Sequence, residues 1–161
     1  MTDGWAVRRL TADEWRCYRA VRLAMLLDHP AAYGSSFARE IAFDEATWRE
    51  RLGHPVLLAV RPDGLPLGAA TLYTPDPGAV PEIVAMWVAG HARGSGVADA
   101  LVEACVEEAA RQGATRVTLH VMADNPRAAA MYARAGFSLD GVPAEAGQGC
   151  ERMSRDVRPV A

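Results

Sequence analysis

The sequence predicts an α/β domain in which helices pack on a sheet. Apolar runs typical of strands alternate with helical patterns along the 161 residues. Residues 56–73 are two apolar runs around Pro-Asp-Gly, a pattern typical of a β-hairpin. Within residues 94–112 the apolar side chains recur with the period of a helix. With 50% hydrophobic and 23% charged residues, we expect a single domain over residues 1–161.

Capping residues, prolines and glycines set the expected element boundaries. Thr11 to Glu14 reads T-A-D-E, a capping box in which Glu14 bonds back to the helix start. Gly113 is well placed to end the helix over residues 94–112. The expected strands are 5–10, the two arms of 56–73, 82–88, 116–121, 137–140 and 151–157; the expected helices are 11 to about 28, 46–52, 94–112 and 126–135.

Composition excludes several classes of protein. The net charge is −3 with no basic stripe, which argues against nucleic-acid binding. No apolar window is long enough to span a membrane, and the first residues carry no apolar signal region, so we expect a cytoplasmic protein. The three cysteines and four histidines are scattered without ligand spacing, so neither a metal site nor a disulfide framework is expected.

Residues 91–98, H-A-R-G-S-G-V-A, lead from a predicted strand into the start of the long helix. The first amides of a helix have no internal partner, and they carry partial positive charge. Glycines at 94 and 96 remove the Cβ atoms that would block an approaching phosphate. The stretch therefore predicts an anion site, although a tight strand-to-helix turn fits it equally well. It lacks the lysine of a P-loop, and Asp99 does not fit a dinucleotide fingerprint.

A second stretch, N-P-R-A-A-A-M-Y-A-R-A-G-F at residues 125–137, predicts a short helix. Asn125 precedes a proline and is suited to cap that helix, and Gly136 closes it. Tyr132 falls on the inward stripe. From periodicity alone, Asn125 is equally a simple cap and Tyr132 equally a core aromatic.

Together the two stretches resemble the signatures of the Gcn5-related N-acetyltransferase (GNAT) family. Residues 91–98 are similar to its acetyl-CoA signature, with His91 standing where Gln or Arg is usual. Residues 125–137 are similar to its later signature N-x-x-A-x-x-x-Y-x-x-x-G-F, without a gap. The resemblance covers nearly the whole chain. It implies a mixed, mostly antiparallel sheet of six to seven strands, with helices on both faces and a splayed strand pair.

The resemblance also implies a site for acetyl-CoA. The strand ending at Val88 and the strand from Arg116 would start paired and then splay, leaving a gap for the pantothenate arm. Tyr132 would point at the thioester sulfur, and Asn125 would touch the cofactor arm. The implied backbone contacts are those of Met86, Trp87 and Val88 for the arm, and those of Arg93, Gly94, Ser95, Gly96, Val97 and Ala98 for the pyrophosphate.

The implied reaction is direct transfer of an acetyl group to a primary amine, without a covalent enzyme intermediate. An amide near Val88 is the expected donor to the oxyanion, and Tyr132 the expected donor to the leaving thiolate. Glu82 is the first candidate for a base, relaying the ammonium proton through water; a solvated carboxylate is the alternative. His120 is a weaker candidate, because Val117, Leu119 and Val121 place it on the opposite face of its strand.

The implied acceptor is a small-molecule or peptide amine whose identity the sequence leaves open. By the same resemblance, residues 27–48, with Asp28, Tyr33 and Asp44, would wall its site and would suit a cationic amine. The same residues equally fit a helix–loop–helix cover over the core. Two other functions remain: a CoA-binding sensor or structural module without turnover, and a nucleotide or NAD binder. A homodimer is possible through the last strand, 151–157, which equally fits an edge strand.

Overall fold

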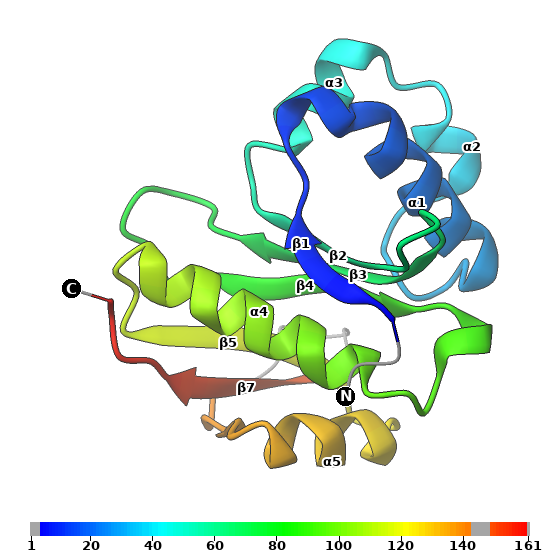
Figure 1. The fold of residues 1–161 in the computed structure, drawn as a ribbon. Coiled ribbons are helices and arrows are strands. Elements are labelled where there is room, and N and C mark those ends of the chain that lie inside the picture. Colours follow the sequence, from blue (N-terminus) through cyan, green and yellow to red (C-terminus); the bar gives the residue numbers. More distant parts are fainter. Residues whose placement is uncertain (1–3, 143–148, 161) are drawn as a thin grey trace.

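A computed structural model describes residues 4–142 and 149–160 of the chain (Figure 1). Its centre is a seven-stranded sheet with the strand order β1-β2-β3-β4-β5-β7-β6. Every neighbouring pair is antiparallel except β4 and β5, which are parallel. The strands are β1 Ala6–Arg9, β2 Val56–Val60, β3 Pro66–Tyr73, β4 Glu82–Val88, β5 Arg116–Met122, β6 Ser138–Leu139 and β7 Cys150–Asp156.

Helices cover both faces of the middle of this sheet. In β2 the consecutive residues 56–59 are all buried, and in β3 residues 67–70 are too; neighbouring residues of a strand face opposite sides. In Figure 1, α4 runs across the sheet, α1 to α3 lie together as a group, and α5 lies near β7. The helices are α1 Trp15–Asp28, α2 Phe37–Glu40, α3 Glu45–Arg51, α4 Val97–Arg111 and α5 Pro126–Arg134, with 3-10 turns at Ala12–Glu14 and Gly90–Ala92. The predicted fold class is confirmed. None of the described helices combines the length and apolar character that crossing a bilayer requires.

The parallel pair β4 and β5 separates soon after it begins. Glu82 pairs with Thr118 and Ile83 with Leu119, and β4 then continues to Val88 with no further pairing to β5. Opposite β3, β4 carries one extra residue near Ala85, whose φ of 53° is unusual for a residue with a side chain. The bulge and the separation both occur midway along β4. The expected splayed strand pair is therefore present.

One boundary prediction was wrong, and one of the two readings left open for the last strand is excluded. The predicted helix over residues 94–112 begins only at Val97, because Gly94 and Gly96 have φ values of 77° and 85° and so cannot continue a right-handed helix. The last strand is not an edge strand, since β7 lies between β5 and the two-residue β6. The capping box is confirmed: the Glu14 carboxylate accepts from the Thr11 amide at 2.8 Å.

Candidate functional site

Two cavities meet where β4 and β5 have separated. The first, about 820 Å³, reaches the start of β4 and is called here the Glu82 cavity. The second, about 790 Å³, reaches the start of α4 and is called the Gly96 cavity. Both are lined by Tyr33, Met86, Asn125, Ala128 and Tyr132, so the two cavities form one passage with these residues at its middle.

The outer end of the Gly96 cavity offers unpaired backbone amides. In the described part of the chain, the amides of residues 94–99 have no main-chain acceptor, and the first helical bond runs from Ala100 to the Gly96 carbonyl at 3.1 Å. A Cβ atom added at Gly94 or Gly96 would meet nothing within 4 Å, so the space before these amides is open. Free amides at a helix start favour an anion. This arrangement fits the pyrophosphate of acetyl-CoA.

Not every side chain of the glycine-rich stretch faces that cavity. Arg93, Gly94, Gly96, Val97 and Ala98 line it. Ser95 and His91 line a different hollow instead, and the Ser95 hydroxyl donates to the Ala92 carbonyl. Ser95 can therefore offer the cavity only its amide, and His91 does not take the side-chain place of the usual Gln or Arg.

A polar cluster holds the loop before α4 against the end of α1. The Arg93 guanidinium donates to Nε2 of His29 at 2.6 Å and lies 3.8 Å from an Asp28 carboxylate oxygen. The same carboxylate oxygen accepts from the indole of Trp87 at 2.9 Å. Asp28 was expected near an amine, but its carboxylate instead accepts from Trp87 of β4 and lies close to Arg93. The cluster fixes the mouth of the Gly96 cavity.

The second half of β4 presents backbone groups to the passage. The Ala89 amide donates to the Leu67 carbonyl of β3 at 2.8 Å, so alternation along the strand turns the polar groups of Val88 away from β3. The Met86 carbonyl accepts from the Tyr33 hydroxyl at 3.2 Å. Met86 and Val88 both line the Gly96 cavity, as does the buried Trp87. The three residues predicted to contact the cofactor arm therefore lie together.

Tyr132 of α5 stands at the junction of the two cavities. Its ring is buried at 8% exposure and meets Phe137 edge-on, with centroids 6.2 Å apart. Burial, with smaller effects of Cys105 and Tyr33, raises the pKa of Tyr132 to about 12. The hydroxyl is therefore protonated at neutral pH and is a hydrogen-bond donor. Tyr132 thus lines both cavities, and its predicted role toward a thioester sulfur stays a prediction.

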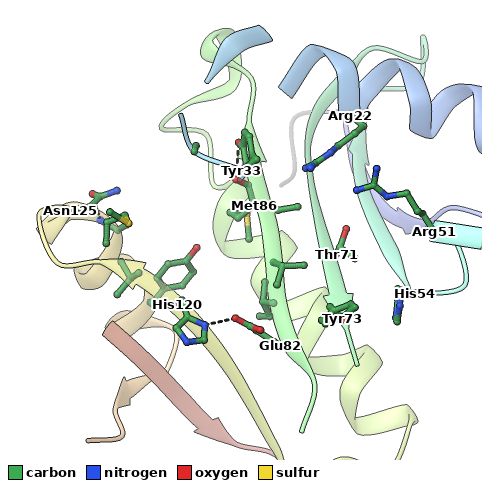
Figure 2. Close-up of a pocket in the computed structure, with 18 of the residues that line it drawn as sticks. Arg22, Tyr33, Arg51, His54, Thr71, Tyr73, Glu82, Met86, His120 and Asn125 are labelled. Carbon is green, nitrogen blue, oxygen red and sulfur yellow. Dashed lines mark hydrogen bonds and ion pairs between the residues drawn. The ribbon is translucent and has the colours of Figure 1, made fainter. Parts of the chain in front are cut away.

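Asn125 is confirmed as a cap, and it also borders the passage. Its side-chain oxygen accepts from the Ala128 amide at 3.1 Å, which closes the start of α5. Asn125 is exposed and lines both cavities. Figure 2 labels it at the Glu82 cavity. The cap uses the side-chain oxygen, and the NH₂ group of the side chain can donate a hydrogen bond to a bound molecule.

Glu82 and His120 face each other at the other end of the passage. Figure 2 shows the imidazole Nδ1 of His120 joined to the Glu82 carboxylate across the start of the splay. Their side chains are 26% and 43% exposed, respectively, so both reach solvent. His120 lies opposite the buried face of β5, as predicted. The sequence treated the two residues as alternatives, whereas the structure makes them a pair.

Two arginines of the Glu82 cavity were missed by sequence reasoning. Arg22 of α1 and Arg51 of α3 extend toward the same space (Figure 2). Both also contact the carboxylate of Glu40. Arg22 adjoins the apolar stripe of α1, and a charge in such a stripe is the signal that could have revealed it. Burial alone would raise the pKa of Glu40, but hydrogen bonds led by that of Arg22 outweigh it and lower this pKa to about 2.

Most of residues 27–48, the expected wall of the acceptor site, do not line the Glu82 cavity. Of this segment only Ala32 and Tyr33 line the Glu82 cavity. Asp44 caps α3, its carboxylate accepting from the Thr47 amide at 2.9 Å. The segment therefore adds no carboxylate to the lining of this cavity, and its expected part in an acceptor site stays a prediction.

The thiols of Cys17 and Cys105 are not activated. Burial raises the pKa of Cys105 to about 12 and also raises that of Cys17. A thiolate nucleophile is therefore disfavoured at both positions. Within residues 4–142 and 149–160, no three His, Cys, Asp or Glu side chains gather as a metal site would require.

The fold of the chain is shared with proteins of solved structure. A GCN5-related N-acetyltransferase from Kribbella flavida is 24% identical with a TM-score of 0.72, covering 98% of this chain and 100% of its own. A phosphinothricin acetyltransferase from Sinorhizobium meliloti, solved with acetyl-CoA, is 20% identical with a TM-score of 0.72, covering 98% and 90%. Mutant forms of the spermidine/spermine N-acetyltransferase SpeG from Vibrio cholerae are 16% identical with a TM-score of 0.72, covering 95% and 94%.

These likenesses establish the fold, while a family model establishes the family. No curated protein matches the sequence significantly. The model described as Acetyltransferase (GNAT) family matches residues 8–137, which includes both signature stretches and most of the chain. The chain therefore belongs to the GNAT family, and the enzyme class predicted from its sequence, an acetyl-CoA-dependent acetyltransferase, is confirmed.

Proposed function

We propose that the protein transfers the acetyl group of acetyl-CoA directly to a primary amine. The observation that carries this proposal is the junction of the two cavities at Tyr132. Acetyl-CoA would enter from the Gly96 side and the amine from the Glu82 side. Acetyl-CoA supplies the thioester; every other contribution comes from residues of the chain.

The Gly96 side would hold acetyl-CoA at two places. The free amides of residues 94–99 suit its pyrophosphate, and the backbone of residues 86–88 suits its pantothenate arm. The Val88 amide, turned away from β3, is the proposed donor to the oxyanion that forms during transfer. A donor of this kind contributes roughly 3–4 kcal/mol to transition-state stabilisation.

Tyr132 would donate a hydrogen bond to the departing sulfur. Its pKa of about 12 exceeds that of an ordinary thiol by about 3.5 units, so complete proton transfer to the thiolate is uphill by about 5 kcal/mol. A hydrogen bond that strengthens as the sulfur gains charge needs no such transfer. The proposed role of Tyr132 is therefore to stabilise the thiolate while keeping its own proton.

Glu82 and His120 would remove the ammonium proton of the acceptor. An amine with a pKa of about 10 is neutral in only about one molecule per thousand at pH 7, which costs near 4 kcal/mol. Both side chains reach solvent and touch each other, so a proton taken at the cavity has a path outward. We propose that the pair accepts it through water and releases it to solvent.

The proposal is tested by incubating the protein with acetyl-CoA and a panel of primary amines. CoA release that depends on both compounds, with formation of the N-acetylated amine, supports it. A CoA-binding sensor or structural module is the second candidate, because the free amides of residues 94–99 suit CoA whether or not turnover follows. Saturable CoA binding without amine-dependent release would favour that candidate.

A further inference from the structure

We infer that the amine acceptor also carries an anionic group, a carboxylate or a similar oxyanion, that binds Arg22 and Arg51. This inference rests on the proposed function and concerns the same passage. Both arginines line the Glu82 cavity, on the side of it that α1 and α3 form (Figure 2). The acceptor would therefore lie with its anion at these arginines and its amine toward Met86 and Tyr132.

Charge is unbalanced at this end of the cavity. The Glu40 carboxylate accepts from Nε and Nη2 of Arg22, both at 3.0 Å, and also contacts Nη1 of Arg51. Among the described residues it is the only carboxylate in salt-bridge contact with either guanidinium. Glu40 is 1% exposed and its pKa is about 2, so it carries one negative charge against two positive charges. The cluster of Arg22, Arg51 and Glu40 therefore has one positive charge in excess, which a ligand can balance.

The two guanidinium groups are already fixed in place. The Arg22 side chain is 7% exposed and lies against the Tyr33 ring, 5.5 Å from its centroid. The Arg51 guanidinium lies 5.6 Å from the Trp48 centroid. Nη1 of Arg22 and both Nε and Nη2 of Arg51 donate to no described residue. These N–H donors are held in place and have no acceptor among the described residues, so they suit an oxyanion. Planar guanidinium groups bind carboxylates in a forked geometry.

The lining of the Glu82 cavity disfavours an acceptor that carries only positive charge. The lining carboxylates are Glu50, which is exposed, and Glu82, which is bound to His120. A polyamine would bring further positive charge beside two arginines in a partly buried space, where like charges repel strongly. An acceptor that bears both an amine and an oxyanion avoids that repulsion. Its oxyanion would lie at the arginines, and its amine would lie toward Met86 and Tyr132.

The inference is tested with pairs of acceptors that share one amine. Each α-, β- and γ-amino acid, and its aminophosphonate analogue where one exists, is compared with its carboxamide at the same acetyl-CoA concentration. We expect kcat/KM for the acids to exceed that for the amides by about 10- to 100-fold, the effect of charge-assisted hydrogen bonds. Equal or better use of the amides overturns the inference.

Arg51→Gln tests whether the arginine causes the preference. Glu40 keeps its bond to Arg22 in this variant, so the fold has its buried pair. We expect the ratio of acid to amide activity to fall toward one, through loss of activity with acids alone. Arg49→Gln is the matched control on the same helix: Arg49 pairs with Glu45 and Asp13 and does not line the cavity. An equal loss for acids and amides in Arg51→Gln overturns the assignment.

Failure of the inference can be separated from failure of the proposed function. Acetyl-CoA binding, measured by calorimetry, does not depend on the acceptor. If acetyl-CoA binds and simple amines are acetylated without preference for acids, only the inference is overturned. If acetyl-CoA binds but no acid is acetylated or bound by the CoA complex, the inference is likewise overturned. Absence of acetyl-CoA binding overturns the proposed function itself.

Discussion

The carboxylate of Glu82 and the imidazole Nδ1 of His120 are in contact where β4 and β5 stop pairing. Glu82 is opposite Thr118 in the parallel register, and His120 follows Thr118 two residues later on the same face of β5. The pair therefore depends on the register of two strands that a long helix separates in the sequence. It joins the two candidate bases into one group at the outer end of the passage.

Glu82→Gln is expected to lower kcat/KM, by about 10- to 1,000-fold, because it removes a proton acceptor. The loss should shrink for weakly basic acceptors, since these arrive with less of the amine protonated. The measurement is kcat/KM across a series of acceptors of decreasing amine pKa. A loss that is the same for every acceptor would contradict the proposed role of Glu82.

His120→Asn is expected to lower kcat/KM in the same direction, and the double variant with Glu82→Gln should be little worse than the worse single variant. Residues that act as one unit are not additive. The measurement is a double-mutant cycle on kcat/KM. Additive losses would mean that the contact between the two side chains has no part in the reaction.

Tyr132→Phe is expected to lower kcat by about 100-fold while leaving the dissociation constant of acetyl-CoA nearly unchanged. The hydroxyl is proposed to act on the departing sulfur, which carries negative charge only during reaction. The ring that packs against Phe137 is retained, so the fold should persist. Single-turnover kinetics and calorimetry give the two quantities. An unchanged kcat would refute this role.

Gly96→Ala is expected to weaken acetyl-CoA binding by at least about tenfold, because a Cβ would project beside the free amides and strain a φ of 85°. Gly64→Ala is the matched control. Gly64 has a φ of 88° and equally open surroundings, but it lies in the hairpin between β2 and β3. Both variants should lose about 1–2 kcal/mol of stability. Equal acetyl-CoA affinity in the two would exclude residues 94–99 as the pyrophosphate site.

Stability in acid should depend on Glu40. Its pKa in the folded protein is about 2, against about 4.3 for an unfolded glutamate. A depressed pKa adds stability above pH 4.3 that is lost as the pH falls toward 2, up to about 3 kcal/mol. Glu40→Gln should be less stable at pH 7, because Arg22 keeps no buried counter-ion, and should lose less stability between pH 4.3 and 2. Denaturant unfolding at several pH values measures both; parallel curves would contradict this.

Much of the fold could be predicted because its local signals agree with one another. The capping box at Thr11, the cap at Asn125 and the Pro-Asp-Gly turn each fix a boundary within a few residues. The two signature stretches identified the family. Those features are encoded in contiguous residues, which is why they can be read without a structure.

The missing parts of the site depend on contacts between distant segments. Arg22, Glu40 and Arg51 come from three separate helices, and their meeting depends on how those helices pack. Asp28 was expected to attract an amine, but its carboxylate is taken by Trp87, which lies 59 residues away in the chain. The bulge at Ala85 contains no glycine, so the sequence gives no sign of it. Periodicity and spacing cannot supply any of these.

Calorimetric titration of acetyl-CoA into the purified protein tests the central claim most directly. We expect saturable binding of one molecule per chain, displaced by CoA and unaffected by ATP or NAD. Gly96→Ala should weaken it, and Gly64→Ala should not. If acetyl-CoA produces no binding heat at millimolar concentration, the passage between the two cavities does not hold this thioester, and the proposed function is contradicted.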